Sequence, residues 1–326
     1  MPAPSDPRGE AARSERQRAT SVGRGAKPPS ELSIGAIFPQ TECGTDVAAI
    51  GEFVRAVEEM GFDHLFVADH VLGADPQHHS HPSLVAYSHE SVVHESLTLL
   101  AYLAAITRRI TLATGILILP QRQTVLVAKQ AAQIDVLSGG RLRLGVGVGW
   151  NAVEYEALNE TFDNRGRRSA EQIAVLRALW TQAVVDFRGE FHRIDHAGLC
   201  PMPIQRPIPI WLGAGSRERA VPPDAVLRRV GRLADGWSPN LTPDASGQAI
   251  VARVHDYARE AGRDPAQLPL EGRIRLAGED AGEWMKQVDA WKALGATSVI
   301  GEPRGDGRTF PDGHLDALRR FRQALG

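Results

Sequence analysis

The stretch Asp135–Leu158, DVLSGGRLRLGVGVGWNAVEYEAL, decides how the rest of the chain is interpreted. A helix is expected to end near its start, and a serine with two glycines then turns the chain into a strand with alternating apolar residues. Along that strand Gly145, Gly147 and Gly149 occupy alternate positions. Glycine in a strand usually marks a close approach by a ligand or another backbone. Trp150 follows where the strand meets its loop, and it could wall in a flat ring.

Composition narrows the class of protein. The chain has 326 residues, a formal net charge of -2 and 43% hydrophobic residues, which suits one large α/β barrel. The near-zero charge argues against nucleic-acid binding, and no apolar run approaches the roughly 18 residues that span a bilayer. Cys43 and Cys200 suggest neither a disulfide framework nor a cysteine metal site, so we expect a cytoplasmic protein.

Residues 1–30 differ from the rest. They are rich in Arg, Ser, Pro and Gly and show no apolar periodicity, so they cannot bury enough surface to offset chain entropy. They also lack the apolar core of a signal peptide. We expect a disordered tail, or an extension from a misassigned start codon, followed by one domain over residues 31–326. A functional basic arm is disfavoured because three acids interrupt its six basic residues.

From Leu32 onward, short apolar runs alternate with amphipathic segments. The expected strands are Ser33–Phe38, His64–Ala68, Ile110–Leu117, Leu142–Val148, Ile208–Leu212, Asp235–Ser238, Leu270–Leu276 and Thr297–Ile300. The expected helices are Val47–Met60, Glu95–Thr107, Thr124–Leu137, Gly166–Thr181, Arg217–Leu233, Ala245–Ala261, Ala281–Leu294 and His314–Leu325. Eight such right-handed units predict an α/β fold of the (β/α)8 TIM barrel type. The alternative, a doubly wound sheet, would need a glycine-rich turn after the first strand, and the chain has Phe38-Pro39-Gln40 there.

Two long loops interrupt the pattern. Val71–Val93 follows the second strand, and Ala183–Pro207 is an insertion before strand five with a segment, GEFHRIDHA, that resembles a small hairpin. Barrel active sites lie at the C-terminal ends of the strands. The first loop is therefore expected over the site and the second outside it.

The strand ends carry the residues suited to a site. They are Phe38-Pro39-Gln40, Asp69-His70, Thr114-Gly115-Ile116, Gly149-Trp150-Asn151, Gly213-Ala214-Gly215-Ser216 and Ser238-Pro239-Asn240. The motifs GFDHLFVADH, AAITRRITLATGILILPQR, VAKQAAQIDVLSGGRLRLGVGVGW and PIPIWLGAGS, followed by ADGW, resemble the luciferase-like monooxygenase superfamily. Within it they are most similar to the oxidoreductases that use coenzyme F420. The motifs span about Ser33 to Asn240, and beyond them only the strand–helix rhythm matches.

The resemblance implies roles for two strand ends. It places Asp69 and His70 beside the cofactor ring as catalytic residues, since an imidazole can transfer protons near neutral pH. From the residues alone, a turn start and a helix cap fit them equally well. It also implies a non-proline cis peptide at Gly115–Ile116, after Thr114, in a bulge that supports the ring. An ordinary buried strand is the alternative there.

Two further strand ends would complete the cofactor site. The resemblance assigns the cofactor phosphate to Gly213-Ala214-Gly215-Ser216, whose N–H groups would open a helix. Arg217 would add a contact or face solvent, and a plain tight turn is the alternative. Gly147, Val148, Gly149 and Trp150 would contact the ring or the cofactor's side chain. Glu154 is expected to be an exposed charge at a helix start, not a catalytic base.

Several histidines and charged residues are expected to lie outside the catalytic and cofactor sites. A metal site at His78, His79 and His81, with His89 and His94 nearby, is disfavoured because the spacing fits no standard zinc pattern. We expect a mobile lid over the substrate instead. A second set matches family positions and is expected to form helix ion pairs: Lys129, Asp135, Arg165, Arg168 and Glu171.

The sequence therefore predicts an oxidoreductase that moves a hydride between coenzyme F420 and a small organic substrate, assisted by His70. The resemblance adds a homodimer, with no nucleic-acid or membrane partner. One alternative is an FMN-dependent monooxygenase of the same superfamily, supplied by a separate reductase. Others are a metal-dependent barrel hydrolase, which usually needs His-x-His after strand one, and a non-catalytic flavin-binding relative.

Overall fold

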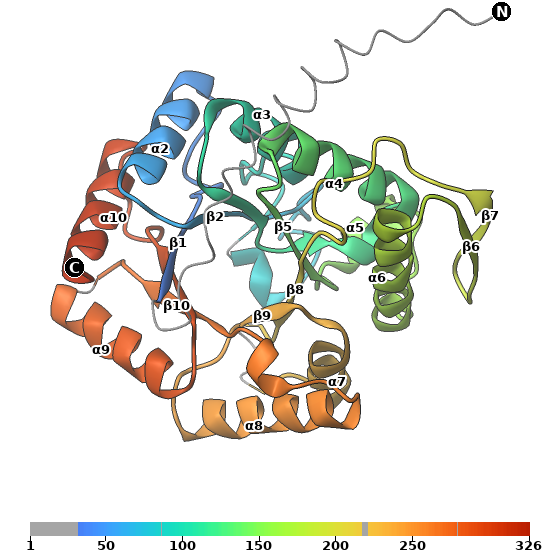
Figure 1. The fold of residues 1–326 in the computed structure, drawn as a ribbon. Coiled ribbons are helices and arrows are strands. Elements are labelled where there is room, and N and C mark those ends of the chain that lie inside the picture. Colours follow the sequence, from blue (N-terminus) through green and yellow to red (C-terminus); the bar gives the residue numbers. More distant parts are fainter. Residues whose placement is uncertain (1–31, 86, 217–220, 279) are drawn as a thin grey trace, which may run out of the picture. The chain divides into compact units, whose positions relative to one another are not determined.

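The computed structural model describes residues 32–326 apart from 86, 217–220 and 279 (Figure 1). The expected tail over residues 1–30 and the expected contact of Arg217 lie outside the described residues. In the part of the chain that is described, no helix is both long and apolar enough to cross a membrane.

Eight parallel strands surround the centre of the domain in the order β10-β11-β1-β2-β3-β5-β8-β9. Their bounds are β1 Ser33–Ile37, β2 His64–Val67, β3 Thr111–Thr114, β5 Leu142–Gly147, β8 Ile210–Ala214, β9 Gly236–Pro239, β10 Glu271–Arg275 and β11 Ser298–Glu302. A two-residue strand, β4 (Leu117–Ile118), also pairs with β5. Trp237 bridges to Leu270 just before β10 and nearly closes the ring. The predicted TIM barrel is confirmed, which excludes the doubly wound sheet.

Helices surround the strands (Figure 1). They are α2 Val47–Glu59, α3 Ser96–Ile106, α4 Thr124–Ser138, α5 Ala152–Ala157, α6 Arg165–Thr181, α7 Asp224–Leu233, α8 Ala245–Glu260, α9 Ala281–Ala293 and α10 Asp312–Ala324. Three short 3-10 helices are η1 Pro82–Val85, η2 Leu119–Gln121 and η3 Pro265–Gln267. Helix α7 begins at Asp224, whereas the expected helix began at Arg217, which lies outside the described residues. Pro222 and Pro223 explain the start at Asp224, because a residue that precedes proline is driven out of the helical region.

The opening stretch of the sequence folds as its residues dictate. Gly139, with a φ of 72°, ends α4 in the left-handed conformation that glycine adopts readily. Strand β5 then alternates, so that Leu142, Leu144 and Val146 are buried against the helices. The intervening residues point into the barrel. The strand thus delivers Gly147 and the loop after it to the C-terminal end of the barrel.

The insertion before β8 forms the expected hairpin outside the barrel (Figure 1). Its strands are β6 Val185–Arg188 and β7 Arg193–Ala197. Glu171 of α6 holds the hairpin by accepting hydrogen bonds from the N–H groups of Glu190 and Phe191 and by pairing with His192 at 2.8 Å.

Two residues that were expected to form ion pairs within helices, Lys129 and Asp135, instead bind the insertion before β8. Asp135 accepts hydrogen bonds from the backbone and side chain of Gln205, at 2.9 and 2.7 Å. Lys129 donates to the carbonyl of Cys200. The helix-pair interpretation is wrong for these two residues, because the insertion folds back onto α4.

Candidate active site

A bulge follows β3 at the C-terminal end of the barrel. The Gly115–Ile116 peptide is cis, so the predicted backbone conformation is confirmed. Thr114 donates its hydroxyl hydrogen to the carbonyl of Gly145, at 2.6 Å. The chain then rejoins the sheet as β4, where Leu117 pairs with Val146. Thr114, Gly115 and Ile116 therefore lie against β5.

The glycines of β5 make room for this bulge. A Cβ atom on Gly145 would lie 2.1 Å from the carbonyl oxygen of Thr114, and one on Gly147 would lie 2.4 Å from Cδ1 of Ile116. A Cβ on Gly213 of β8 would lie 3.1 Å from Cγ2 of the same isoleucine. Close approach was predicted at Gly145 and Gly147, and the group that approaches both is the protein's own bulge.

Asp69 is a buried anchor of the bulge. Its side chain is 3% exposed and accepts hydrogen bonds from Ser96 Oγ at 2.9 Å and the N–H of Ile118 at 3.0 Å. Arg122 adds an ion pair at 2.7 Å. These donors come from α3, from the strand after the bulge and from the segment after η2. Asp69 therefore holds the backbone after the bulge through the N–H of Ile118.

His70 forms a dyad with Glu154. Its Nδ1 lies 3.1 Å from Oε2 of Glu154, and no described residue hydrogen-bonds its Nε2. Glu154 is completely buried and also accepts hydrogen bonds from the N–H groups of Val71 and Leu72, at 2.8 and 3.2 Å. The expected exposed charge at a helix start is therefore wrong, because the loop after β2 closes over α5.

Burial alone would raise the pKa of Glu154. The hydrogen bond and charge of His70 and the N–H groups of Val71 and Leu72 outweigh that burial, so the pKa lies below its ordinary value. Glu154 is therefore ionised at neutral pH. An ionised acceptor strengthens the hydrogen bond from Nδ1 and orients the imidazole.

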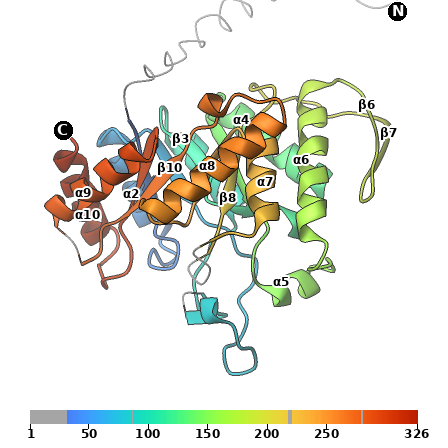
Figure 2. The same ribbon diagram turned by 90° about the horizontal axis from the view of Figure 1, so that it is seen from below.

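Aromatic rings surround the dyad. Tyr87 stacks on His70 with ring centroids 3.9 Å apart, and His81 stacks on Trp150 at 4.6 Å. The rings of His70 and Trp150 meet edge to face at 5.8 Å. Burial, and then the charges of Glu154 and Asp69, raise the pKa of Tyr87, so its phenol stays protonated. The loop after β2 thus lies over the strand ends, on the same side as α5 (Figure 2).

The loop histidines lie outside the group of metal-compatible spacing found among the described residues. Among the described residues, the one group with metal-compatible spacing is Asp186, Asp195 and His196, which is exposed on the β6–β7 hairpin. His78 instead pairs with Asp75 at 2.8 Å. His81 contacts Trp150, as described above.

The far wall of the barrel carries charges that sequence reasoning missed. Near the ends of β10 and β11, Glu302 pairs with Arg273 at 3.8 Å and with Arg304. Deeper in the barrel, Arg143 lies 3.2 Å from Glu271. Burial raises the pKa of Glu271, but the charges of Arg143 and His64 outweigh it and lower the pKa to about 2. Strand alternation predicts that the strand residues of this set point into the barrel, because each follows an apolar or small residue that faces outward. These residues are Arg143, Glu271, Arg273 and Glu302.

The loop Gly213-Ala214-Gly215-Ser216 lies at the end of β8, as predicted, and Gly215 has a φ of 80°. The described part of the helix that was expected to begin at Arg217 is α7, which starts at Asp224. Residues 217–220, directly after this loop, lie outside the described residues.

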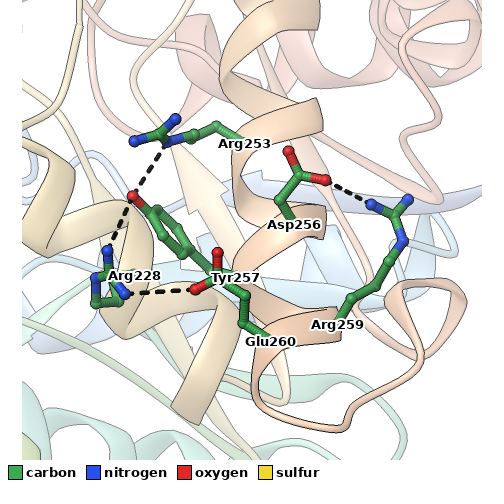
Figure 3. Close-up of a pocket in the computed structure, with 6 residues that line it drawn as sticks. All are labelled: Arg228, Arg253, Asp256, Tyr257, Arg259 and Glu260. Carbon is green, nitrogen blue, oxygen red and sulfur yellow. Dashed lines mark hydrogen bonds and ion pairs between the residues drawn. The ribbon is translucent and has the colours of Figure 1, made fainter.

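A pocket of about 400 Å³ lies between α7 and α8, on the outer layer of helices (Figure 3). It is lined by Arg228, Arg253, Asp256, Tyr257, Arg259 and Glu260. Its arginines already pair with acids, for example Arg259 with Asp256 at 2.6 Å. Because it is far from the strand ends and internally neutralised, we do not assign the active site to it.

Comparison with known proteins identifies the family of this chain. The family model of luciferase-like monooxygenases matches residues 30–304. The chain belongs to the luciferase-like monooxygenase family. This confirms the resemblance and places the chain among oxidoreductases and monooxygenases, not barrel hydrolases.

Two relatives illustrate the range of this luciferase-like family. An uncharacterised protein of Mycobacterium tuberculosis is 32% identical over 230 residues, which cover 69% of this chain and 77% of that protein. An FMNH2-dependent dimethylsulfone monooxygenase of Pseudomonas fluorescens is 30% identical over 306 residues, covering 86% of this chain and 75% of that enzyme.

Solved structures share the fold. An F420-dependent secondary alcohol dehydrogenase in complex with an F420-acetone adduct superposes with a TM-score of 0.72 at 17% identity, covering 91% of this chain and 99% of that one. Monooxygenase RslO1 from Streptomyces bottropensis gives a TM-score of 0.68 at 20% identity, covering 90% and 98%. Both deazaflavin and flavin enzymes therefore occur among the similar proteins.

Proposed function

We propose that the protein is an oxidoreductase that moves a hydride between coenzyme F420 and a small organic substrate at the C-terminal end of the barrel. The observation that carries the proposal is the His70–Glu154 dyad. It leaves one imidazole nitrogen without a hydrogen bond to any described residue, beside an aromatic wall and the bulge. A partly exposed imidazole held in this way is suited to proton transfer.

The residues present fit a planar cofactor. Ile116 offers an apolar surface flanked by Gly147 and Gly213, which have no side chains to cover it. Trp150 adds an aromatic face close to His70. In this proposal Thr114, Gly115 and Ile116 support the ring, residues 147–150 contact its edge, and residues 213–216 contact the phosphate-bearing chain.

The reaction divides between cofactor and protein. A deazaflavin, when bound, supplies or accepts the hydride. His70 donates its Nδ1 hydrogen to Glu154, which fixes the tautomer, and its Nε2 gives or takes a proton at the substrate oxygen or nitrogen. Glu154 stabilises the imidazolium when Nε2 holds a proton, as a carboxylate does behind a catalytic histidine. Asp69 holds the bulge in place through the N–H of Ile118.

A second candidate is an FMN-dependent monooxygenase. It is favoured by the likeness to the FMNH2-dependent monooxygenase of Pseudomonas fluorescens, which extends over 86% of this chain. A separate reductase would then supply reduced flavin. For either reaction we propose that the protein forms a homodimer. We also propose that it lies in the cytoplasm, where an exposed free thiol such as that of Cys200 stays reduced.

Titration of the purified protein with F420 and, separately, with FMN tests the proposal through the change in chromophore fluorescence. Saturable binding of F420 with little response to FMN is the expected result. Tight binding of FMN alone would transfer the assignment to the monooxygenase. No response to either compound would contradict both candidates.

A further inference from the structure

The first turn of α6 carries an unusual concentration of positive charge. Its sequence from Asn164 is NRGRR, with no acid in the first turn and no side-chain cap from Asn164. The N-terminus of a helix is the positive end of its dipole, so cations are unfavourable there and anions are favourable. The charges at this turn therefore need partners.

Two of the three arginines have carboxylate partners. Arg167 pairs with Glu190 at 2.5 Å, and Arg168 pairs with Glu160 at 2.5 Å. Arg165 differs from both. It donates only to the carbonyl of Phe162, at 2.8 Å, lies 3.6 Å over the Phe162 ring, and its buried Nε has no hydrogen-bond partner among the described residues.

A second arginine approaches the same turn from α7, which lies beside α6 (Figure 2). A Cβ atom on Gly166 would lie 2.6 Å from Nη2 of Arg229. No described residue forms a hydrogen bond or an ion pair with Arg229. Burial lowers the pKa of Arg229, and the charge of Arg165 lowers it further.

Arg229 thus lies against the turn that carries Arg165, and neither forms an ion pair with a described acid. This arrangement is unfavourable by itself, since partly buried charges are normally paired. We propose that Arg165 and Arg229 together bind a phosphate group. Guanidinium forks match the oxygens of a phosphate.

The position suggests where the phosphate comes from. Tyr155 donates to the carbonyl of Val148, at the end of β5, and its ring meets that of Phe162 at 5.2 Å. Phe162 in turn lies under Arg165. These contacts join the turn that carries Arg165 to the loop after β5, which the proposed function assigns to the cofactor ring. One source of the phosphate is therefore the cofactor itself, which rests on the proposed function; its phosphate would then lie at the arginine pair, and residues 213–216 would contact the chain beside it. A separate phosphate-bearing molecule is the other source.

Thermal unfolding of R165Q, R229Q and wild type, with and without inorganic phosphate at constant ionic strength, tests the site itself. R228Q is the matched control, because Arg228 is the neighbouring, exposed arginine and already pairs with Glu260 at 3.4 Å. Without phosphate, R229Q should have a Tm at or above that of wild type, since it removes an unpaired charge. Phosphate should then raise the Tm of wild type and R228Q more than that of R165Q or R229Q.

Equal phosphate responses in all four proteins would overturn the proposal. General stabilisation by phosphate acts on every variant alike, so only the difference between variants counts.

Binding of FMN against riboflavin, and of F420 against its phosphate-free riboside, identifies the source. If the cofactor's phosphate is bound, R229Q loses about tenfold in affinity for the phosphorylated compound alone. A phosphate response without that loss supports a site for a separate phosphate-bearing molecule. If no cofactor binds any variant, the proposed function fails, while the melting difference still decides the arginine site.

Discussion

At the scale of single residues, the hydrogen bond between His70 and Glu154 determines what the site can do. It commits Nδ1 of the imidazole and leaves Nε2 for substrate. Glu154 receives this hydrogen bond while fully buried, so its charge acts through little solvent. Proton transfer and orientation can therefore be tested separately by substituting the two residues.

His70→Ala is expected to leave F420 binding intact and to lower kcat by about 100-fold, since general acid–base catalysis typically contributes that much. Fluorescence titration and steady-state kinetics measure the two effects. His78→Ala is the control, because His78 is exposed and pairs only with Asp75. Unchanged turnover in His70→Ala would remove His70 from the mechanism.

Glu154→Gln is expected to change how stability depends on pH. The folded-state pKa of Glu154 lies below the ordinary 4.5, so its ionised form stabilises the fold above pH 4.5. That contribution is lost as the pH falls through the lowered pKa. Urea unfolding should therefore show a steeper loss of stability below pH 4.5 in wild type than in the variant.

Glu156→Gln, on the same short helix but exposed, should behave as wild type in that experiment. Parallel pH profiles for wild type and Glu154→Gln would show that the carboxylate is not ionised in the folded protein.

At the scale of elements, the bulge after β3 and strand β5 require each other. The glycines of β5 leave space that Thr114 and Ile116 fill, and Asp69 holds the N–H of Ile118 from the opposite side. A change on β5 therefore displaces the bulge, and through it the surface proposed to support the ring.

Gly145→Ala should destabilise more than Gly147→Ala. The new methyl of the first would meet the carbonyl oxygen of Thr114, while that of the second meets only the end of the Ile116 side chain, which can rotate. Overpacking costs about 1–3 kcal/mol, with the backbone collision at the upper end.

Urea unfolding measures both variants, and Gly282→Ala in the first turn of α9 is the control, with only Asp280 Oδ1 at 3.2 Å from the new Cβ. A larger loss in Gly147→Ala than in Gly145→Ala would contradict this account of the bulge.

At the scale of the whole molecule, charges inside the barrel join strands that are distant in the chain. Arg143 of β5 and Glu271 of β10 pair at 3.2 Å, and Ser298 of β11 donates to Glu271 at 2.8 Å. Removing either partner should destabilise the fold, because the remaining charge would be buried without a charge of opposite sign beside it.

Glu271→Gln is expected to lower the free energy of unfolding by about 3–5 kcal/mol, because it leaves the buried charge of Arg143 without an anionic partner. The double variant Arg143→Met/Glu271→Met should recover part of that loss, since apolar groups of similar volume can replace a buried ion pair. The recovery is incomplete because the buried His64, 2.7 Å from Glu271, still loses its partner. Urea unfolding of the single and double variants gives the coupling. Additive losses would show that the two charges do not interact.

The sequence by itself determined the order of strands and helices and the glycines of β5, and its motifs carried the resemblance to the family, which in turn implied the bulge at Gly115–Ile116. These features depend on neighbouring residues and on motifs that are read locally. The burial of Glu154, the anchoring by Asp69 and the approach of Arg229 to the first turn of α6 were decided only by tertiary structure. His70 and Glu154, for example, are 84 residues apart in the chain. Barrel closure brings such residues together, and their burial and charge follow from neighbours that no local pattern specifies.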